Sequence, residues 1–476
     1  MKYDIVIIGA GPAGLYLAGL LGKSKKILLI ESGHEGFSES ANDLLSGFSY
    51  ENQKDNIYPH SFPGEYRYRG IGGASNLWGG ACGCFSQDEL DSWSIPNLYL
   101  NENYERAGKR IGISLKYEMF FNGNELFNGI NQLKNFSNDR LVILPSPTNV
   151  KQKLLANINK KNVKILTNTT MFNFKIDKNQ INILNLFDHR QKKYFEINNF
   201  KKIIFCMGGL EINRQIRFSL NKTKFQNKLI GSFYSPHINF YLSNIYFNNN
   251  LRVKPYNSVI NNNVIRPYIA LKNKNLMNER LMNFKCLVDS PINSEENGIS
   301  KIFQKHVDHP NKGIGINDLF SKIKNKIKPS SQYSMNFSFD QTPNEFSKII
   351  LSEELDFLGV PKLEIRHKIS KNDLALMKNT IRKLSVELYD QKIARFPNNF
   401  DKKFLYENIS SNSHHCGGTI IGTNQNNSVV DENLRLHGLK NGYIVSSSIF
   451  KRPGGINPTF SILAFADRLV EHLLNG

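Results

Sequence analysis

The chain has 476 residues, 40% of them hydrophobic and 21% charged, which is typical of a globular protein large enough for two domains and excludes a disordered or fibrous chain. Its net charge of +20 would suit a polyanionic partner, but the basic residues are spread out and no nucleic-acid motif occurs, so we attribute the charge to composition and expect no nucleic-acid partner. No run of eighteen apolar residues occurs, so a membrane-spanning helix is not expected.

The first thirty residues are expected to form a strand, a helix and a second strand. Residues 4–8 are an unbroken apolar run of the kind that is buried on both faces of a sheet. Residues 12–22 have the apolar spacing of a helix that ends in a glycine, and residues 27–30 form a second buried run. This order predicts one βαβ unit.

A glycine triplet joins the first strand to the helix. Gly9 permits a tight turn, Gly11 lets the backbone approach a pyrophosphate, and Gly14 allows close packing of helix on strand. Glu31 ends the second strand, where it can accept hydrogen bonds from an adenosine ribose and argues against a 2′-phosphate. The unit therefore predicts dinucleotide binding, and by itself it leaves FAD and NAD both open.

A second glycine-rich stretch runs from Arg69 to Gly80. Its backbone is free to wrap a flat polar ring, which Ser75 and Asn76 can hydrogen-bond and Trp78 can cover. Arg69 can meet a phosphate. A surface loop is the alternative, but surface loops seldom contain tryptophan.

The rest of the chain is expected to contain one loop-rich segment, at residues 35–150, followed by strands and helices. Strands are expected at 163–166, in a hairpin through 185 and at 201–206. Helices are expected at 210–219 and 371–390. The aromatic, alternating block 233–410 is read as an inserted α+β domain. We therefore expect a nucleotide-binding domain formed by residues 1–232 and 411–476 and a substrate domain formed by 233–410.

Two segments near the C-terminus contain groups suited to acid–base chemistry. His414 and His415 precede Cys416-Gly417-Gly418-Thr419, and a neutral imidazole takes up a proton readily near neutral pH. Asn457 stands in Gly-Ile-Asn-Pro-Thr before a helical run at 460–474, which also suits a helix cap followed by proline. His437 lies in a turn and is read as structural.

The five cysteines, Cys82, Cys84, Cys206, Cys286 and Cys416, do not form a disulfide framework and lack zinc spacing, so we expect no metal site. They are read as buried thiols in a reducing compartment. The N-terminal run leads directly into the glycine fingerprint and is not read as a signal peptide, so a cytoplasmic location is expected.

Taken together, these motifs resemble the glucose-methanol-choline (GMC) oxidoreductase family over nearly the whole chain. The resemblance rests on the N-terminal fingerprint, the Gly-Gly-Ala-Ser-Asn loop, the turn at 203–209 with Glu211-x-Asn213, Asp340-Gln341-x-Pro343-Asn344 and the C-terminal block. It implies an α/β fold in which a Rossmann-like FAD-binding domain carries an inserted α+β substrate domain built on an antiparallel sheet.

The resemblance also assigns roles to residues. His415, in the spacing His-x-x-Gly-Thr, would be the catalytic base, with His414 as the alternative, and Asn457 would hydrogen-bond the substrate hydroxyl. The helix that begins after Asn457 would stabilise a reduced, anionic flavin through its N-terminal dipole. The FAD would be held by Gly9, Gly11, Pro12, Ala13, Gly14, Glu31, Ser32, Arg69, Gly73, Ser75, Asn76, Leu77, Trp78, Gly79, Met171, Gly208, Ser447, Asn457, Pro458 and Thr459.

Two positions depart from the family pattern. Leu77 stands where some relatives carry a histidine that bonds covalently to the flavin, so noncovalent FAD is expected. Ser446 stands where relatives tend to carry an acidic residue, which puts the usual polar contacts to the ribityl chain in doubt.

The sequence thus predicts an FAD-dependent oxidoreductase that converts a hydroxyl group to an aldehyde or ketone. The Ser-Asn-Leu-Trp loop and the Gly-Ile-Asn-Pro segment most resemble the sugar-oxidising members, so a sugar, amino sugar or glycoside is the expected substrate. A sterol-like alcohol is the second choice. A lyase with structural FAD, or a flavin-binding protein without turnover, are the alternatives of another class.

Residues 317–328 are predicted to form a basic amphipathic helix. Leu319, Phe320, Ile323 and Ile327 share one face, and lysines crowd the others. A surface helix of the inserted domain accounts for this pattern. The alternative is weak contact with an anionic membrane surface or an acidic carrier.

Overall fold

The computed structural model describes residues 3–49, 67–121, 133–145, 147–221, 223–248, 258–260, 263–272, 280–289, 332–397, 400–401, 404–405, 408–411 and 414–475. The helix expected at 317–328 lies outside these residues. Within the described part of the chain, no helix is both long and apolar enough to cross a membrane.

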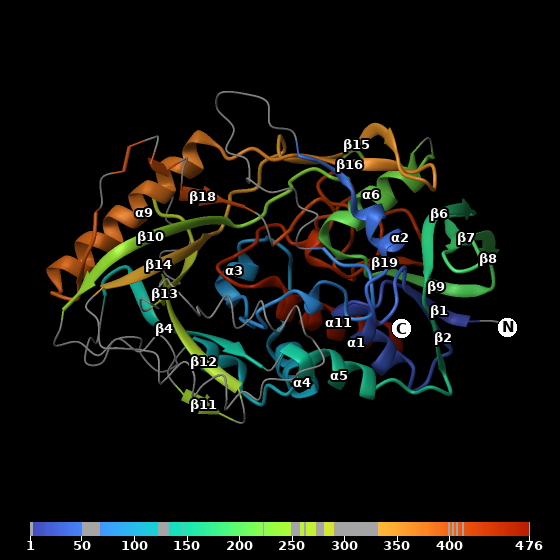
Figure 1. Cartoon of the computed structure of the whole chain (residues 1–476), viewed down its shortest axis with the longest axis horizontal. Helices are drawn as coiled ribbons and strands as arrows, with labels where there is room; N and C mark the ends of the chain where they lie inside the picture. Colours follow the sequence, from blue (N-terminus) through green and yellow to red (C-terminus); the bar gives the residue numbers. More distant parts are fainter. Residues whose placement is uncertain are drawn as a thin grey trace.

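A five-stranded parallel sheet forms around the first strand of the chain (Figure 1). β1 (Tyr3–Ile8) lies between β2 (Ile27–Ile30) and β9 (Phe200–Phe205). β5 (Val163–Leu166) and β19 (Gly442–Ile444) form the two edges. The central strands are continuous apolar runs because both faces of the sheet are covered. The predicted βαβ unit and α/β class are confirmed.

Helices from distant parts of the chain pack beside this sheet. Figure 1 shows them clustered near both chain ends. They are α1 (Pro12–Leu21), α4 (Asn101–Ile111), α5 (Pro147–Ala156) and α11 (Pro458–Asn475). Because α1 directly follows β1 and α11 follows β19, the packing of α1 on α11 brings the two ends of the sequence together.

A buried carboxylate joins three of these helices. Asp467 of α11 is only 4% exposed. It accepts hydrogen bonds from the Tyr16 hydroxyl of α1 (2.6 Å), and from the Asn103 amide (3.0 Å) and the Arg106 guanidinium (2.7 Å) of α4. Hydrogen bonds to a buried charge are among the stronger ones in proteins, so this contact fixes the three helices relative to one another.

The expectation that residues 35–150 are loop-rich was only partly right. This segment contains α2 (Glu39–Asn42), β3 (Gly47–Ser49), α3 (Gln87–Asp91), α4, β4 (Phe136–Leu144) and α5. In α4 the buried residues Tyr104, Ala107 and Ile111 are spaced three and four apart, and Gly112 closes the helix in the left-handed region. That apolar stripe was the signal for the helix.

An antiparallel sheet forms the other half of the molecule, at the left of Figure 1. Its order is β11 (Ser258–Ile260), β12 (Asn263–Leu271), β13 (Phe284–Asp289), β14 (Gln332–Phe339), β10 (Ile238–Phe247) and β17 (Ala394–Arg395). β18 (Ile409–Ser410) also pairs with β10. α9 (Lys371–Asp390) shares a hydrophobic core with this sheet. The predicted antiparallel sheet and the helix at 371–390 are confirmed.

Two smaller sheets and α6 (Gly208–Leu220) complete the described fold. One sheet is β15 (Lys348–Leu355), β16 (Pro361–Arg366) and β3; the other is β6 (Thr169–Asp177), β7 (Gln180–Asp188) and β8 (Lys193–Ile197). β4 pairs with β12, and β16 pairs with β3, so strands pair across the boundary that we expect at residue 233.

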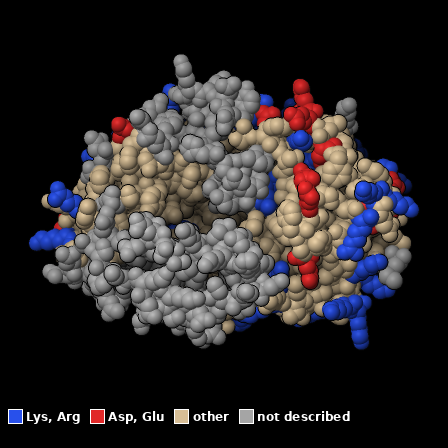
Figure 2. Space-filling view, in the orientation of Figure 1, with Lys and Arg blue, Asp and Glu red and all other residues tan. Residues whose placement is uncertain are grey.

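Basic side chains are spread over the face seen in Figure 2. Among the described residues drawn there, Lys and Arg lie at both ends of the molecule, with acidic residues between and beside them. This distribution agrees with the view that the charge of +20 reflects composition.

A Gly14→Ala substitution is expected to destabilise the protein by about 1–3 kcal/mol, the usual cost of overpacking. A Cβ at Gly14 would lie 1.9 Å from the Gly9 carbonyl oxygen, so helix and turn must separate. Chemical denaturation measures the effect.

Gly19→Ala in the same helix is the matched control. Its Cβ would meet Asn157 at an ordinary 3.4 Å, and alanine favours a helix over glycine by about 1 kcal/mol, so this variant should be neutral or more stable. Equal loss in both variants would contradict the role given to Gly14.

Candidate active site

A cavity of about 480 Å³ opens at the carboxyl ends of the parallel strands. Ile8, Glu31, Cys206 and Val445, which lie at or just after the ends of β1, β2, β9 and β19, all line it. Open parallel sheets bind ligands outside these strand ends, because helix N-termini and connecting loops converge there.

Nearly all of the residues predicted to form the site line this cavity. The two exceptions are Gly14 and Asn76. Gly14 packs against the Gly9 turn, as its predicted packing role requires. Asn76 has turned into its own loop, where its amide donates to the carbonyls of Ile71 (3.0 Å) and Gly73 (2.9 Å). Asn76 therefore shapes the loop instead of facing the cavity.

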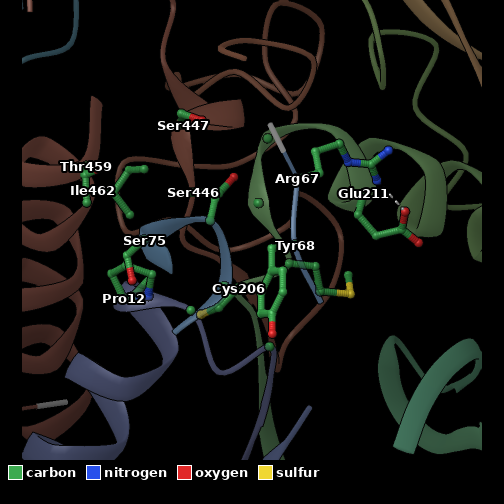
Figure 3. Close-up of a pocket in the computed structure, with 18 of the residues that line it drawn as sticks. Pro12, Arg67, Tyr68, Ser75, Cys206, Glu211, Ser446, Ser447, Thr459 and Ile462 are labelled. Atoms are coloured by element: carbon green, nitrogen blue, oxygen red, sulfur yellow. Dashed lines mark hydrogen bonds and ion pairs between the residues drawn. The ribbon is translucent and has the colours of Figure 1, made fainter. Parts of the chain in front are cut away.

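The two glycine-rich loops touch at the base of the cavity. A Cβ on Gly73 would lie 3.0 Å from the Gly11 Cα, and Gly73 has a φ of +51°. Figure 3 shows Pro12 and Ser75 side by side at the start of α1. The tight contact and the positive φ favour glycine at position 73, and the N-terminal fingerprint and the second glycine loop form one surface.

Glu31 is buried at the end of β2, and its carboxylate holds the glycine turn. It accepts hydrogen bonds from the backbone N–H of Ala10 (2.7 Å) and of Gly33 (3.1 Å). Burial raises the pKa of Glu31, while these two N–H groups and Arg69 act in the opposite direction. A carboxylate has about four acceptor positions, so Glu31 can hold the turn and still accept from a ligand hydroxyl.

An arginine cluster forms the wall opposite α11. Glu211 of α6 pairs with Arg67 (3.0 Å), Arg69 (2.9 Å) and Arg214 (2.9 Å), and Figure 3 shows the Arg67 contact facing the cavity. Burial alone would raise the pKa of Glu211, but Arg214, Arg69 and Arg67 lower it to about 2. Arg214 also pairs with Asp356, so three guanidinium groups meet two carboxylates and this wall keeps a net positive charge that favours anions.

The two adjacent histidines both line the cavity but have different partners. The Nδ1 atom of His415 lies 2.8 Å from the hydroxyl of Tyr234, and the Ser447 hydroxyl donates to the His415 carbonyl. His414 instead contacts Asn457, with 3.2 Å between His414 Nε2 and Asn457 Nδ2. The structure thus brings Asn457 to His414 and Tyr234 to His415.

A chain of hydrogen bonds continues behind His414. Its Nδ1 lies 2.8 Å from Nδ1 of His237, and Nε2 of His237 donates to the carbonyl of Gly454 (2.8 Å). Burial lowers the pKa of His237 to about 3, and burial together with His237 lowers the pKa of His414 well below its usual value. Both rings are therefore neutral at physiological pH.

Asn457 is also held by the antiparallel sheet. Its Oδ1 accepts a hydrogen bond from Nζ of Lys285 on β13. Burial, together with the charge of Arg266, lowers the pKa of Lys285 to about 7. Sequence reasoning missed Tyr234, His237 and Lys285. The available signal for Lys285 was a charge inside the apolar run Phe284–Val288.

Asp340 holds the loop that presents Asn457. Its carboxylate accepts from the N–H of Gly454 (3.0 Å) and pairs with Arg452 (3.0 Å). Burial raises the pKa of Asp340 to about 6, although Arg452 opposes the change. The Asp-Gln-x-Pro-Asn motif thereby contributes a structural contact to the site.

Serine and threonine hydroxyl groups surround position 446, where relatives tend to carry an acidic residue. Ser446 and Ser448 are hydrogen-bonded to each other at 2.6 Å, and Thr419 donates to Ser448 at 2.6 Å. Ser446 and Ser447 also line the cavity, on the side between α11 and α6 (Figure 3). Neutral hydroxyls can donate as well as accept, so this wall suits a polyhydroxyl chain.

The residues present fit an FAD. Glycine loops and the first turn of α1 suit a pyrophosphate, and the carboxylate of Glu31 suits a ribose. The indole Nε1 of Trp78 is a buried donor on the cavity wall that has no hydrogen-bond partner among the described residues. Buried donors are nearly always satisfied, so this atom indicates a missing acceptor.

Comparison with known proteins supports this assignment. A family model described as GMC oxidoreductase matches residues 343–466. The chain carries a GMC oxidoreductase domain. The fold agrees over the full length: the crystal structure of pyridoxine 4-oxidase from Mesorbium loti superposes with a TM-score of 0.59 over 99% of both chains, at 18% identity.

A curated relative matches a smaller part. The fructose dehydrogenase large subunit from Gluconobacter japonicus is 21% identical over 170 residues, which are 34% of this chain and 29% of that protein. The chain therefore spans less than a third of that relative's length in the match. The predicted GMC resemblance and fold class are confirmed.

Proposed function

We propose that this protein is an FAD-dependent oxidoreductase that converts a CH–OH group to an aldehyde or ketone. One observation carries the proposal: a single cavity brings two glycine loops suited to a dinucleotide together with His414, His415 and Asn457. A dinucleotide site alone would suit many enzymes. The addition of a base and an amide that can hold an oxygen favours the oxidation of an alcohol.

Each part of the cofactor has a matching wall. The pyrophosphate would lie at the N-terminus of α1, with the ribose at Glu31 and Arg69 available to phosphate. The flat ring would lie against Leu77 and Trp78. When bound, the flavin supplies the acceptor for a hydride from the carbinol carbon. The N-terminus of α11 directs positive potential into the same cavity.

His415 is proposed to remove the hydroxyl proton. Its Nδ1 is held by Tyr234, so Nε2 is the atom that would take the proton. His414 is less suited to this role, because its Nε2 already faces the amide of Asn457. His414 would instead orient Asn457, and Asn457 would hold the substrate oxygen.

A sugar, amino sugar or glycoside is the proposed substrate class. The match to the fructose dehydrogenase large subunit supports a sugar, and so does the hydroxyl-rich wall at Ser446 and Ser447. The full-length fold likeness to pyridoxine 4-oxidase supports a second candidate, a primary alcohol on a heteroaromatic ring. A sterol-like alcohol and a lyase with structural FAD remain the competing hypotheses.

Anaerobic mixing of the FAD-loaded protein with an alcohol panel tests the function. The panel holds sugars, amino sugars, glycosides, pyridoxine and a sterol. We expect at least one sugar-class member to bleach the yellow flavin band, since hydride transfer reduces the ring. A flavin that stays oxidised while a substrate is cleaved would support the lyase, and no bleaching by any alcohol would refute the proposal. Reoxidation by oxygen and by a dye would then identify the acceptor class.

The bound FAD is expected to be noncovalent, because Leu77 offers no nucleophile for a flavin bond. Precipitation with acid should move all of the yellow colour into the supernatant. Colour that remains with the denatured chain would show a covalent link through another residue.

His415→Ala is expected to slow flavin reduction at least a hundredfold while FAD stays bound, because a positioned base typically contributes about 10²–10⁴ in rate. His414→Ala is the matched neighbour and should cost less. Stopped-flow absorbance at a saturating alcohol concentration measures both rates. The reverse order would assign the base to His414.

A further inference from the structure

Lys285 is an ammonium group in a place where the fold favours an apolar side chain. It is 3% exposed and lies on β13 between Phe284 and Cys286, both members of the hydrophobic core under α9. Successive side chains of a strand point to opposite faces, so Lys285 points away from that core. Its ammonium group reaches Asn457, 172 residues later in the sequence.

This contact decides which end of the Asn457 amide faces His414. Lys285 Nζ donates to Oδ1 of Asn457. In its charged form this group has no acceptor, so the charged form holds only Oδ1 of the amide. The Nδ2 group must then point to the other side, where it lies 3.2 Å from His414 Nε2. Lys285 thereby makes Asn457 a donor toward the histidine.

The Gly454 carbonyl, at the other end of this chain of hydrogen bonds, imposes the same assignment of donors and acceptors. The Gly454 carbonyl accepts only, so Nε2 of His237 carries a proton. The Nδ1 of His237 is then an acceptor, and the proton between the two rings belongs to His414 Nδ1. That leaves His414 Nε2 as an acceptor for Asn457. Arguments from both ends therefore give one arrangement of protons.

We propose that Lys285 is a positioning residue for the reaction: it holds Oδ1 of the Asn457 amide, on the side away from His414, so that Asn457 presents N–H groups in the cavity. This inference rests on the proposed function only for its catalytic consequence. The orientation itself follows from the contacts of Lys285, Asn457, His414 and His237.

Energetics support a functional reason for this lysine. Burial, together with the charge of Arg266, lowers its pKa to about 7. A buried amine is costly compared with an apolar side chain of similar volume. Groups with shifted pKa values gather at functional sites, and this one touches a residue that lines the cavity.

The first experiment is a double-mutant cycle on flavin reduction. Lys285→Met keeps the side-chain volume and removes every donor, and we expect reduction to slow about tenfold or more, since small misplacements of a reacting group cost up to about a hundredfold. In an Asn457→Ala background the same change should have little effect, because Lys285 then has no amide to orient. Lys285→Arg, which donates only, should restore part of the rate.

The second experiment does not depend on turnover. Nitrogen-15 NMR of protein labelled at histidine and asparagine reports which ring nitrogen carries the proton and how the Asn457 side-chain amide is held, with signals assigned through His414→Gln, His237→Gln and Asn457→Ala. In the wild-type protein we expect His414 protonated at Nδ1 and His237 at Nε2. Lys285→Met should leave these tautomers in place, because the Gly454 carbonyl still sets them, but should shift or broaden the Asn457 amide signal, since Oδ1 has lost its donor. Lys451→Met, which removes a partly buried lysine that donates to the Trp93 carbonyl, is the control and should leave the Asn457 amide signal unchanged.

The outcomes separate this inference from the proposed function. An unchanged Asn457 amide signal in Lys285→Met would overturn it, and so would an equal rate loss in the wild-type and Asn457→Ala backgrounds. If no alcohol reduces the flavin of the wild-type protein, the proposed function fails, while the NMR result still decides whether Lys285 orients Asn457.

Discussion

The buried carboxylate of Asp467 is the contact on which the site depends. It receives hydrogen bonds from Tyr16 of α1 and from Asn103 and Arg106 of α4, and so it locks α11 against the N-terminal βαβ unit. Removing one partner of a buried charge typically costs several kcal/mol. Because Asn457 immediately precedes α11 and Gly11 immediately precedes α1, this lock places the amide of one end of the chain beside the glycine turn of the other.

Two sheets with different roles meet at the cavity. The parallel sheet contributes strand ends, glycine turns and the N-termini of helices, which together suit a negatively charged dinucleotide. The antiparallel sheet contributes Lys285 from β13, and His237 lies directly before β10 of the same sheet. Both residues converge on the loop that carries Asn457. The antiparallel sheet therefore also sets the geometry of the loop that carries Asn457.

The electrostatics of the cavity differ from one end to the other. At the end of α6, three arginines surround one carboxylate, and the pKa of Glu211 falls to about 2 despite its burial. At the histidine end, burial keeps His237 and His414 neutral. A fixed positive wall suits the charged part of a cofactor, whereas neutral, hydrogen-bonded rings suit the uptake of a proton.

The sequence by itself determined the elements whose signals are local. Neighbouring residues were enough to predict the buried strands β1 and β2, the glycine triplet, the helix at 371–390 and the motif resemblance. Burial is visible in the spacing of apolar residues, and backbone freedom is visible in the position of glycines. The loop-rich reading of residues 35–150 missed α4, whose apolar stripe lies among polar residues. Tertiary structure alone decided that Asn457 meets His414 and that Lys285 reaches Asn457. These contacts join residues far apart in the chain. Strand pairing and helix packing bring them together, and both depend on the whole core, which no short segment encodes.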